Sequence, residues 1–216
     1  MSAFSRNWER KESRGFGSRF REGLRNPGPV KPRIDQAVRD LQIQLAKLDT
    51  SSARIKARGD AIFGKTVSAL QKHDGQHAAV YANELSEIRR MGRMITQASL
   101  ALEQVVLRLG TITEMGDVAA ALAPTVSVVR EVRESLDTII PETSGEMNEI
   151  STLLSSILVD AGTIRGSSLN FELANEEAER TLEEAAIVAE QRMKDKFPEI
   201  PAAVAMSGDE DEATTV

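Results

Sequence analysis

The chain has 216 residues, of which 41% are hydrophobic and only 4% aromatic. Few strand-forming aromatic residues favour long helices over sheets, and the lack of cysteine excludes disulfides and thiolate metal sites. The net charge of −6 hides a division: residues 1–110 hold 20 Lys and Arg against 11 Asp and Glu, whereas residues 111–216 hold 7 against 22. This division predicts an anionic partner for the first half and a self-neutralising or regulatory role for the second.

Residues 1–30 contain four glycines and two prolines, which predicts a flexible arm and not a stable helix. Large apolar side chains alternate there with basic ones: Phe4, Trp8, Phe16, Phe20 and Leu24 with Arg6, Arg10, Lys11, Arg14, Arg19, Arg21 and Arg25. This combination favours insertion into an anionic lipid surface. Two alternatives are that the arm packs on its own chain, or that its aromatic rings stack on nucleic-acid bases.

Residues 31–110 carry the pattern of a helical hairpin. A first helix over 31–72, about 60 Å long, is predicted from apolar residues repeating every 3.5 positions. Its seam is Ile34, Val38, Leu41, Leu45, Leu48, Ser52, Ile55, Gly59, Ile62, Thr66 and Ala69. His73-Asp74-Gly75 predicts a tight break, after which a second seam follows through Tyr81, Leu85, Ile88, Gly92, Ile95, Ser99, Leu102, Val106 and Leu109. So short a connection predicts antiparallel helices, with Gly59 and Gly92 allowing their backbones to approach closely.

Shorter helices are predicted for residues 111–165, which complete a helical core over 31–165. Their expected limits are 117–123, 125–140 closed by Pro141, and 144–160 closed by Gly162. The chain as a whole is therefore expected to be all-α, with a flexible arm at one end and a disordered acidic tail at the other.

Residues 166–196 predict an acidic regulatory helix, with its helical part over 171–195 and its end set by Pro198. Its expected apolar side is Phe171, Ala174, Ala178, Leu182, Ala185 and Val188. Since this helix is acidic and the hairpin basic, we expect it to fold back on the hairpin. Removing residues 166–216, which include this helix, should then expose basic surface on the hairpin and promote polymers.

The segment from Gly59 to Thr66 matches the phosphate-binding pattern G-x-x-x-x-G-K-[ST] letter for letter. Such a loop needs a preceding strand, whose turn into a helix presents backbone amides to phosphate. Here the preceding residues continue a helical seam, and Ile62 lies at a buried position of that seam. We therefore interpret the match as helix and not as a nucleotide site.

His73 and His77 are the two histidines, four residues apart, a spacing that suits a metal only on one intact helix face. Gly75 lies between them, so a solvated turn is the favoured interpretation. No catalytic group, metal or cofactor is predicted, and the chain is not expected to be an enzyme. The longest charge-free run, 118–129, is too short to span a bilayer.

The segment 197–216 begins with Phe197-Pro198-Glu199-Ile200-Pro201, whose alternating prolines hold a chain extended for docking in a groove. The simpler alternative is a helix stop followed by a linker. The order of basic aromatic arm, hairpin, short helices, acidic helix and proline segment resembles the ESCRT-III family, and within it the archaeal CdvB group of cell-division proteins. The resemblance covers about residues 1–201 and is greatest in Ile157–Thr163, Asn170–Glu179 and Ala189–Pro201.

This resemblance implies a cytoplasmic subunit that forms homo- or hetero-polymers with related subunits. They would lie on the inner face of the cell membrane at the division site and constrict the division neck. It also implies that Phe197, Pro198, Ile200 and Pro201 bind the MIT domain of the disassembling AAA ATPase, CdvC. With 15 residues after Pro201, the chain resembles a short paralogue without a C-terminal winged helix. A coiled-coil protein that binds nucleic acid, or another helical scaffold, is the alternative function, although nucleic acid is not the expected partner.

Overall fold

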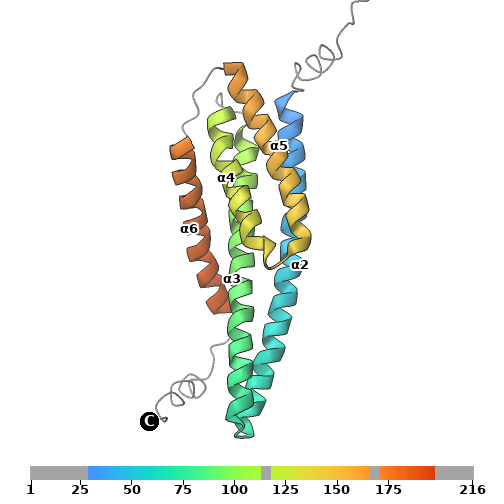
Figure 1. Ribbon diagram of the computed structural model, residues 1–216, viewed down its shortest axis with the longest axis vertical. Coiled ribbons are helices and arrows are strands. Elements are labelled where there is room, and N and C mark those ends of the chain that lie inside the picture. Colours follow the sequence, from blue (N-terminus) through green and yellow to red (C-terminus); the bar gives the residue numbers. More distant parts are fainter. Residues whose placement is uncertain (1–28, 113–117, 166–170, 198–216) are drawn as a thin grey trace, which may run out of the picture.

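The computed structural model describes residues 29–112, 118–165 and 171–197. Within these residues the chain forms helices without any strand: α2 (Val30–Gln71), α3 (Gly75–Ile112), α4 (Val118–Asp137), α5 (Pro141–Arg165) and α6 (Phe171–Lys196). α2 and α3 form a long hairpin that carries the other helices along its sides (Figure 1). The all-α fold predicted from the sequence is confirmed.

A three-residue turn joins α2 to α3. The backbone N–H of His73 donates to the carbonyl of Leu70 at 3.0 Å, and the φ of His73 is 56°, in the left-handed region that often ends a helix. The Asp74 carboxylate then accepts the backbone N–H of His77 at 3.1 Å and caps the first turn of α3. The break predicted at 73–75 is thus confirmed.

The two predicted seams form the interface of this hairpin. All eleven seam positions of α2 and all nine of α3 are buried or half-buried. Helices of 42 and 38 residues are about 63 and 57 Å long at 1.5 Å per residue. Because each helix covers the other's apolar face over most of that length, the hairpin forms a continuous rod.

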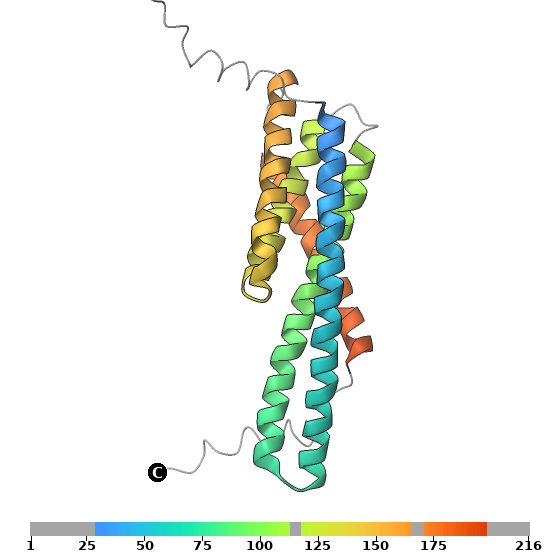
Figure 2. The same ribbon diagram turned by 90° about the vertical axis from the view of Figure 1, so that its right-hand side faces the viewer.

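α4 and α5 form a second, shorter hairpin that covers the half of the rod away from the α2–α3 turn (Figure 2). The chain enters α5 directly from α4, with the backbone N–H of Ile140 donating to the Leu136 carbonyl at 2.8 Å. The half of the rod nearer the turn is left to α2, α3 and one end of α6 (Figure 1).

The prediction that Pro124 separates two helices is wrong. α4 continues through this residue from Val118 to Asp137. A proline inside a helix costs about 3 kcal/mol or more. Leu122 and Val126, on either side of Pro124, are both buried in the core, and their packing offsets this cost.

The predicted ends of the next helix also need correction. Pro141 was expected to close a helix, but it is the first residue of α5, where its missing N–H would have had no partner in the helix. Gly162 was expected to end the helix, yet α5 extends to Arg165. Proline and glycine mark limits in the sequence without saying on which side the helix lies.

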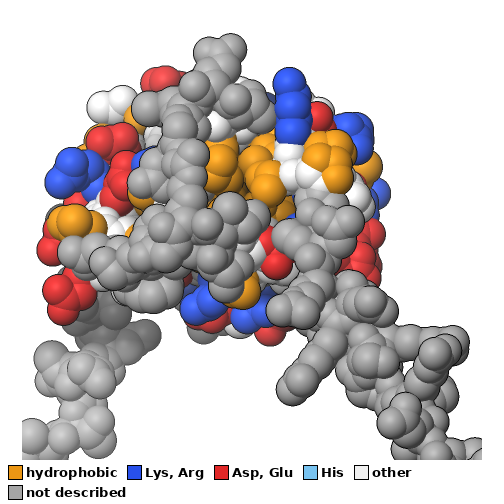
Figure 3. Space-filling model, turned by 90° about the horizontal axis from the view of Figure 1, so that it is seen from above, with side chains coloured by type: hydrophobic (Ala, Val, Ile, Leu, Met, Phe, Trp, Pro, Cys, Tyr) orange, Lys and Arg blue, Asp and Glu red, His pale blue; other side chains and the backbone are white. Residues whose placement is uncertain are grey.

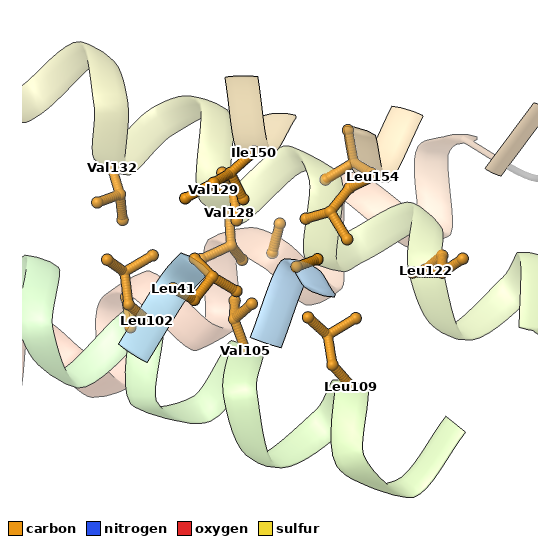
Figure 4. Close-up of a cluster of buried hydrophobic side chains, with 14 of the residues drawn as sticks. Leu41, Leu102, Val105, Leu109, Leu122, Val128, Val129, Val132, Ile150 and Leu154 are labelled. Carbon is orange, nitrogen blue, oxygen red and sulfur yellow. The ribbon is translucent and has the colours of Figure 1, made fainter. Parts of the chain in front are cut away.

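The main core lies where α2, α3, α4 and α5 meet. Figure 4 shows large aliphatic side chains from these helices pointing at one another. Leu41, Leu102, Leu109, Val129 and Leu154 are among them, and each is fully buried. Leu and Val fill this space without polar atoms, so this end of the molecule carries most of its hydrophobic stabilisation.

The surface mixes charges with single apolar side chains. Figure 3 looks onto the end opposite the α2–α3 turn, where hydrophobic groups lie between basic and acidic ones. Large side chains that are more than half exposed include Ile43, Val80, Leu107, Val159 and Leu173. Scattered apolar residues of this kind are ordinary on a protein surface, so they do not by themselves identify a binding site.

Candidate functional site

Most of the predicted binding residues lie outside the described part of the chain. This holds for the arm residues Phe4, Trp8, Phe16, Phe20, Leu24, Arg6, Arg10, Lys11, Arg14, Arg19, Arg21 and Arg25, and for Pro198, Ile200 and Pro201. Their roles stay predictions. Phe197 is described, and only 7% of its surface is exposed. The first residue of the predicted docking segment is therefore buried against the fold.

The phosphate-loop match is helix, as interpreted from the sequence. α2 runs without interruption through Gly59–Thr66, and the Thr66 hydroxyl donates to the carbonyl of Ile62 within the same helix at 3.0 Å. The Lys65 ammonium lies 5.8 Å from the ring centroid of Tyr81 on α3, within reach of a cation–π contact. Helical backbone amides are engaged along the helix, so this segment has no phosphate cradle.

His73 lies in the turn and His77 in the first helical turn of α3, and both are exposed, in agreement with the solvated interpretation. His77 Nδ1 and Asp74 Oδ2 are 2.8 Å apart. This hydrogen bond, helped by that from the His77 backbone N–H, lowers the pKa of the Asp74 carboxyl below its ordinary value. The carboxylate thus remains charged where it caps α3, which has a partial positive charge at its N-terminus.

α6 lies antiparallel to α3 and also touches α4 (Figure 1). Its buried face is built mostly of alanine: Ala174, Ala178, Ala185 and Ala189. The predicted face included Val188, which is instead 38% exposed, and Ala189 takes its place. The prediction placed the next apolar contact three positions after Ala185, whereas the next buried residue lies four positions after it.

Two larger side chains anchor the C-terminal end of α6. Met193 and Phe197 join a second apolar cluster with Ile62, Leu85 and Ile88 of the hairpin. This cluster lies nearer the α2–α3 turn than the main core. α6 therefore carries a thin apolar face along most of its length and its bulkiest contacts at one end.

The hairpin receives these two side chains at glycines. A Cβ atom on Gly59 would lie 2.5 Å from Cε1 of Phe197, and one on Gly92 would lie 2.9 Å from Cε of Met193. Both distances are far inside the 3.5–4.0 Å at which carbon atoms pack. The sequence assigned these glycines to close approach of α2 and α3, but the nearest neighbours are Phe197, which directly follows α6, for Gly59 and Met193 of α6 for Gly92. We call the surface around Gly59 and Gly92 the glycine groove.

Polar contacts also join α6 to the hairpin. Arg108 forms an ion pair with Glu177 at 2.7 Å, and the Gln97 amide donates to the carbonyl of Leu182 at 3.2 Å. The ion pair is partly exposed, and such pairs contribute about 0–1 kcal/mol. Charge attraction aids this contact, but burial of apolar groups holds it.

α5 makes a matching electrostatic contact with α2. Arg33 pairs with Asp160 and donates to the Ser156 hydroxyl at 2.7 Å. Glu146 accepts hydrogen bonds from Lys47 and Gln44. These hydrogen bonds, of which that from Lys47 has the larger effect, hold the pKa of the Glu146 carboxyl below its ordinary value. Spacing along the sequence gives no signal for these pairs, because the partners are about a hundred residues apart.

Comparison with known proteins decides the family. The chain is 41% identical to Cell division protein B1 of Sulfolobus acidocaldarius over 175 residues, which are 81% of this chain and 82% of that protein. The chain belongs to the archaeal CdvB family of cell division proteins, which are of the ESCRT-III type.

Two more CdvB relatives come from the same organism. Cell division protein B is 29% identical over 79% of this chain and 67% of its own length. Cell division protein B3 is 24% identical over 77% of this chain and 96% of its own length. No protein-family model and no solved structure matches the chain. The resemblance noted from the order of sequence segments is thus confirmed by CdvB sequences, and the chain has a role in cell division of the ESCRT-III kind.

Among the described residues of this CdvB protein, no helix has the length and apolar character needed to cross a bilayer.

Proposed function

We propose that this CdvB protein is a polymer-forming subunit that assembles on membranes and is held inactive while α6 covers the hairpin. The proposal is supported by the side chains through which α6 contacts the hairpin, which are mostly alanines with one Met and one Phe at the C-terminal end. Each buried alanine methyl contributes about 0.8 kcal/mol, against about 1.5–3 kcal/mol for a side chain such as Met or Phe. A helix anchored mainly by two side chains at one end can detach while the leucine-rich core stays folded.

Detachment would uncover basic surface on the hairpin. Arg108 would lose Glu177, its partner on α6, and the groove at Gly59 and Gly92 would open. The freed surface is both basic and apolar, which suits a neighbouring subunit or an anionic membrane. Several relatives of one organism bear the cell division protein B name, which supports mixed polymers of related chains.

Membrane contact is assigned to the arm over 1–30. Each basic residue near an anionic surface adds about 1 kcal/mol, and the aromatic rings supply apolar insertion. This part of the proposal rests on the sequence pattern alone. With the arm bound to lipid in this way, the protein would lie at the inner face of the cell membrane during division.

Disassembly is assigned to an AAA ATPase of the CdvC kind. Its MIT domain would bind Phe197, Pro198, Ile200 and Pro201. While α6 lies on the hairpin, which we call the closed conformation, the ring of Phe197 lies in the glycine groove. A subunit in the closed form would therefore present an incomplete docking segment. The ATPase would act on opened, polymerised subunits in preference to closed monomers.

The test compares the full chain with variants lacking residues 166–216 or residues 1–30, each incubated with anionic vesicles or duplex DNA across a salt series. Sedimentation and electron microscopy are the measurements. We expect polymers on vesicles to increase without residues 166–216, and vesicle binding to fall without the arm. A variant lacking 166–216 that stays monomeric on vesicles would refute the role of α6, and preference for DNA would favour the nucleic-acid alternative.

A further inference from the structure

The turn between α2 and α3 contains the linkage Asp74-Gly75, the only Asp-Gly pair in the chain, which has no Asn-Gly pair. At an Asp-Gly linkage the backbone nitrogen of the glycine can attack the γ-carboxyl carbon of the aspartate. Glycine favours this attack because it has no side chain to hinder ring closure. The hairpin turn therefore carries a linkage that is reactive in an unfolded chain.

Both reacting groups are accessible in the folded chain. Gly75 is exposed, and 43% of the Asp74 side chain is exposed. Gly75 is also the first residue of α3, a position at which the backbone N–H has no acceptor within its own helix. Helical hydrogen bonding, which protects the amides further along α3, therefore does not protect the nitrogen of Gly75.

His77 engages both oxygens of the Asp74 carboxylate. Oδ1 accepts the backbone N–H of His77 at 3.1 Å, and Oδ2 lies 2.8 Å from the ring Nδ1. For the attack to succeed, the carboxyl group must turn toward Gly75 and one of its oxygens must be protonated, so that it leaves as water. Both steps require a hydrogen bond to the charged carboxylate to be broken, and such bonds are stronger than those between neutral groups.

We propose that Asp74-Gly75 is a site of isoaspartate formation in this protein, and that His77 is the residue that restrains the reaction. The Gly75 nitrogen forms a bond to Cγ of Asp74, and one carboxyl oxygen leaves as water with the amide proton and a proton from solvent. The product is a succinimide ring. One water molecule then opens the ring: cleavage at Cγ restores aspartate, whereas cleavage at the α-carbonyl carbon leaves Gly75 joined to Cγ, as isoaspartate. The mass of the chain is unchanged, and water is the only other reactant.

This change would alter the hairpin at its turn. The backbone carbonyl of Asp74 accepts the N–H of Ala78 at 3.1 Å, while its side chain caps α3 through His77. In isoaspartate the two carboxyl groups exchange places along the chain and the backbone gains one methylene group, so neither contact keeps its present geometry. The turn end of the rod should then fray. This inference concerns the hairpin turn and does not depend on α6, membrane binding or polymer formation.

The experiment follows the full chain during incubation at a temperature below its unfolding transition. Isoaspartate is measured by methylation with an isoaspartate methyltransferase. Its position is found by digestion with endoproteinase Asp-N, which cleaves before aspartate but not before isoaspartate. We expect slow formation at position 74 in the folded chain and faster formation in the same chain unfolded in urea. Gly75→Ala should form little, and its added methyl group meets nothing within 4 Å, so the turn should stay intact.

Substitutions of the two histidines test the restraint. His77→Ala keeps the backbone N–H but removes the ring, and should accelerate isoaspartate formation about three- to tenfold, the factor expected from loss of one hydrogen bond. His77→Asn retains a side-chain N–H close to the position of Nδ1 and should restore the slow rate. His73→Asn is the matched control in the same turn, because asparagine tolerates the φ of 56° found there, and it should leave the rate unchanged.

Isoaspartate absent from position 74 in both the folded wild type and His77→Ala would overturn the assignment of the site. Equal rates in His77→Ala and His77→Asn would overturn the role of the His77 ring. The same conclusion would follow if His73→Asn accelerated the reaction as much as His77→Ala does, since any change in the turn would then suffice.

Discussion

Gly59→Ala should open α6 without unfolding the hairpin. The added methyl group would lie 2.5 Å from Cε1 and 3.2 Å from Cδ1 of Phe197, so the ring must leave its position. Loss of this buried ring costs the closed form about 1.5–3 kcal/mol. Each 1.4 kcal/mol is a tenfold change in an equilibrium constant, so the population with α6 detached should rise about 10- to 100-fold.

Gly64→Ala is the matched control on the same helix. A Cβ atom at Gly64 would meet nothing within 4 Å. Both substitutions stabilise the helical form of α2 by about 0.8–1 kcal/mol. This effect is the same with α6 attached or detached, because α2 stays helical in either case. The two variants should therefore differ in the state of α6 alone.

Hydrogen exchange of the amides in α6 measures the opening directly. Exchange over residues 171–197 should accelerate about 10- to 100-fold in Gly59→Ala and remain at the wild-type rate in Gly64→Ala. In a chain that already carries Phe197→Ala, the Gly59 substitution should have no further effect, because the ring it displaces is gone. Equal exchange in the two glycine variants would refute the assignment of Gly59 to α6.

Three further substitutions test neighbouring parts of the argument. Gly92→Ala should open α6 less than Gly59→Ala does, because the flexible thioether opposite can move aside, and Gly110→Ala, with open space around it, is its control in the same exchange measurement. Leu102→Ala, at a fully buried position, should lower the free energy of unfolding by about 2–5 kcal/mol in urea denaturation, whereas Leu107→Ala, 70% exposed, should change it little; similar losses would contradict the placement of the core. Glu146→Gln tests the α5 contact: because hydrogen bonds depress the folded-state pKa of this carboxyl, its contribution to stability is present above the ordinary value of 4.5 and is lost as the pH falls through the folded value. The variant should therefore lose less stability than the wild type on acidification below pH 4.5, and an unchanged acid dependence would show that Glu146 does not contribute.

The sequence predicted the hairpin well because the signal for it is local. An apolar residue every three or four positions fixes which face of a helix must be covered, and a turn of three residues leaves an antiparallel partner as the nearest cover. The phosphate-loop match at Gly59–Thr66 was rejected on the same periodicity, and the helical backbone there confirms it.

Proline and glycine were less reliable guides. Pro124 lies inside α4 and Pro141 starts α5, because neighbouring buried side chains and the position within the helix decide what a proline does. Similarly, the sequence marked Gly59 as a place of close approach without showing that the approaching group is Phe197. The missed residue, Ala189, differed from the predicted Val188 by one position on the helix.

By itself, then, the sequence determined two long helices, their turn, their covered faces, and the opposition of a basic first half to an acidic second half. The charge pattern also predicted that α6 folds back on the hairpin. Only the tertiary structure decided that it lies along α3 and α4, that Phe197 fills the space over Gly59, and that Arg33 pairs with Asp160. Periodicity reports what each helix needs to bury. It cannot report which distant segment covers that face, because the choice depends on shape and charge brought together from parts of the chain that lie far apart in the sequence, such as Gln97 and Leu182, 85 residues apart, and Arg33 and Asp160, 127 residues apart.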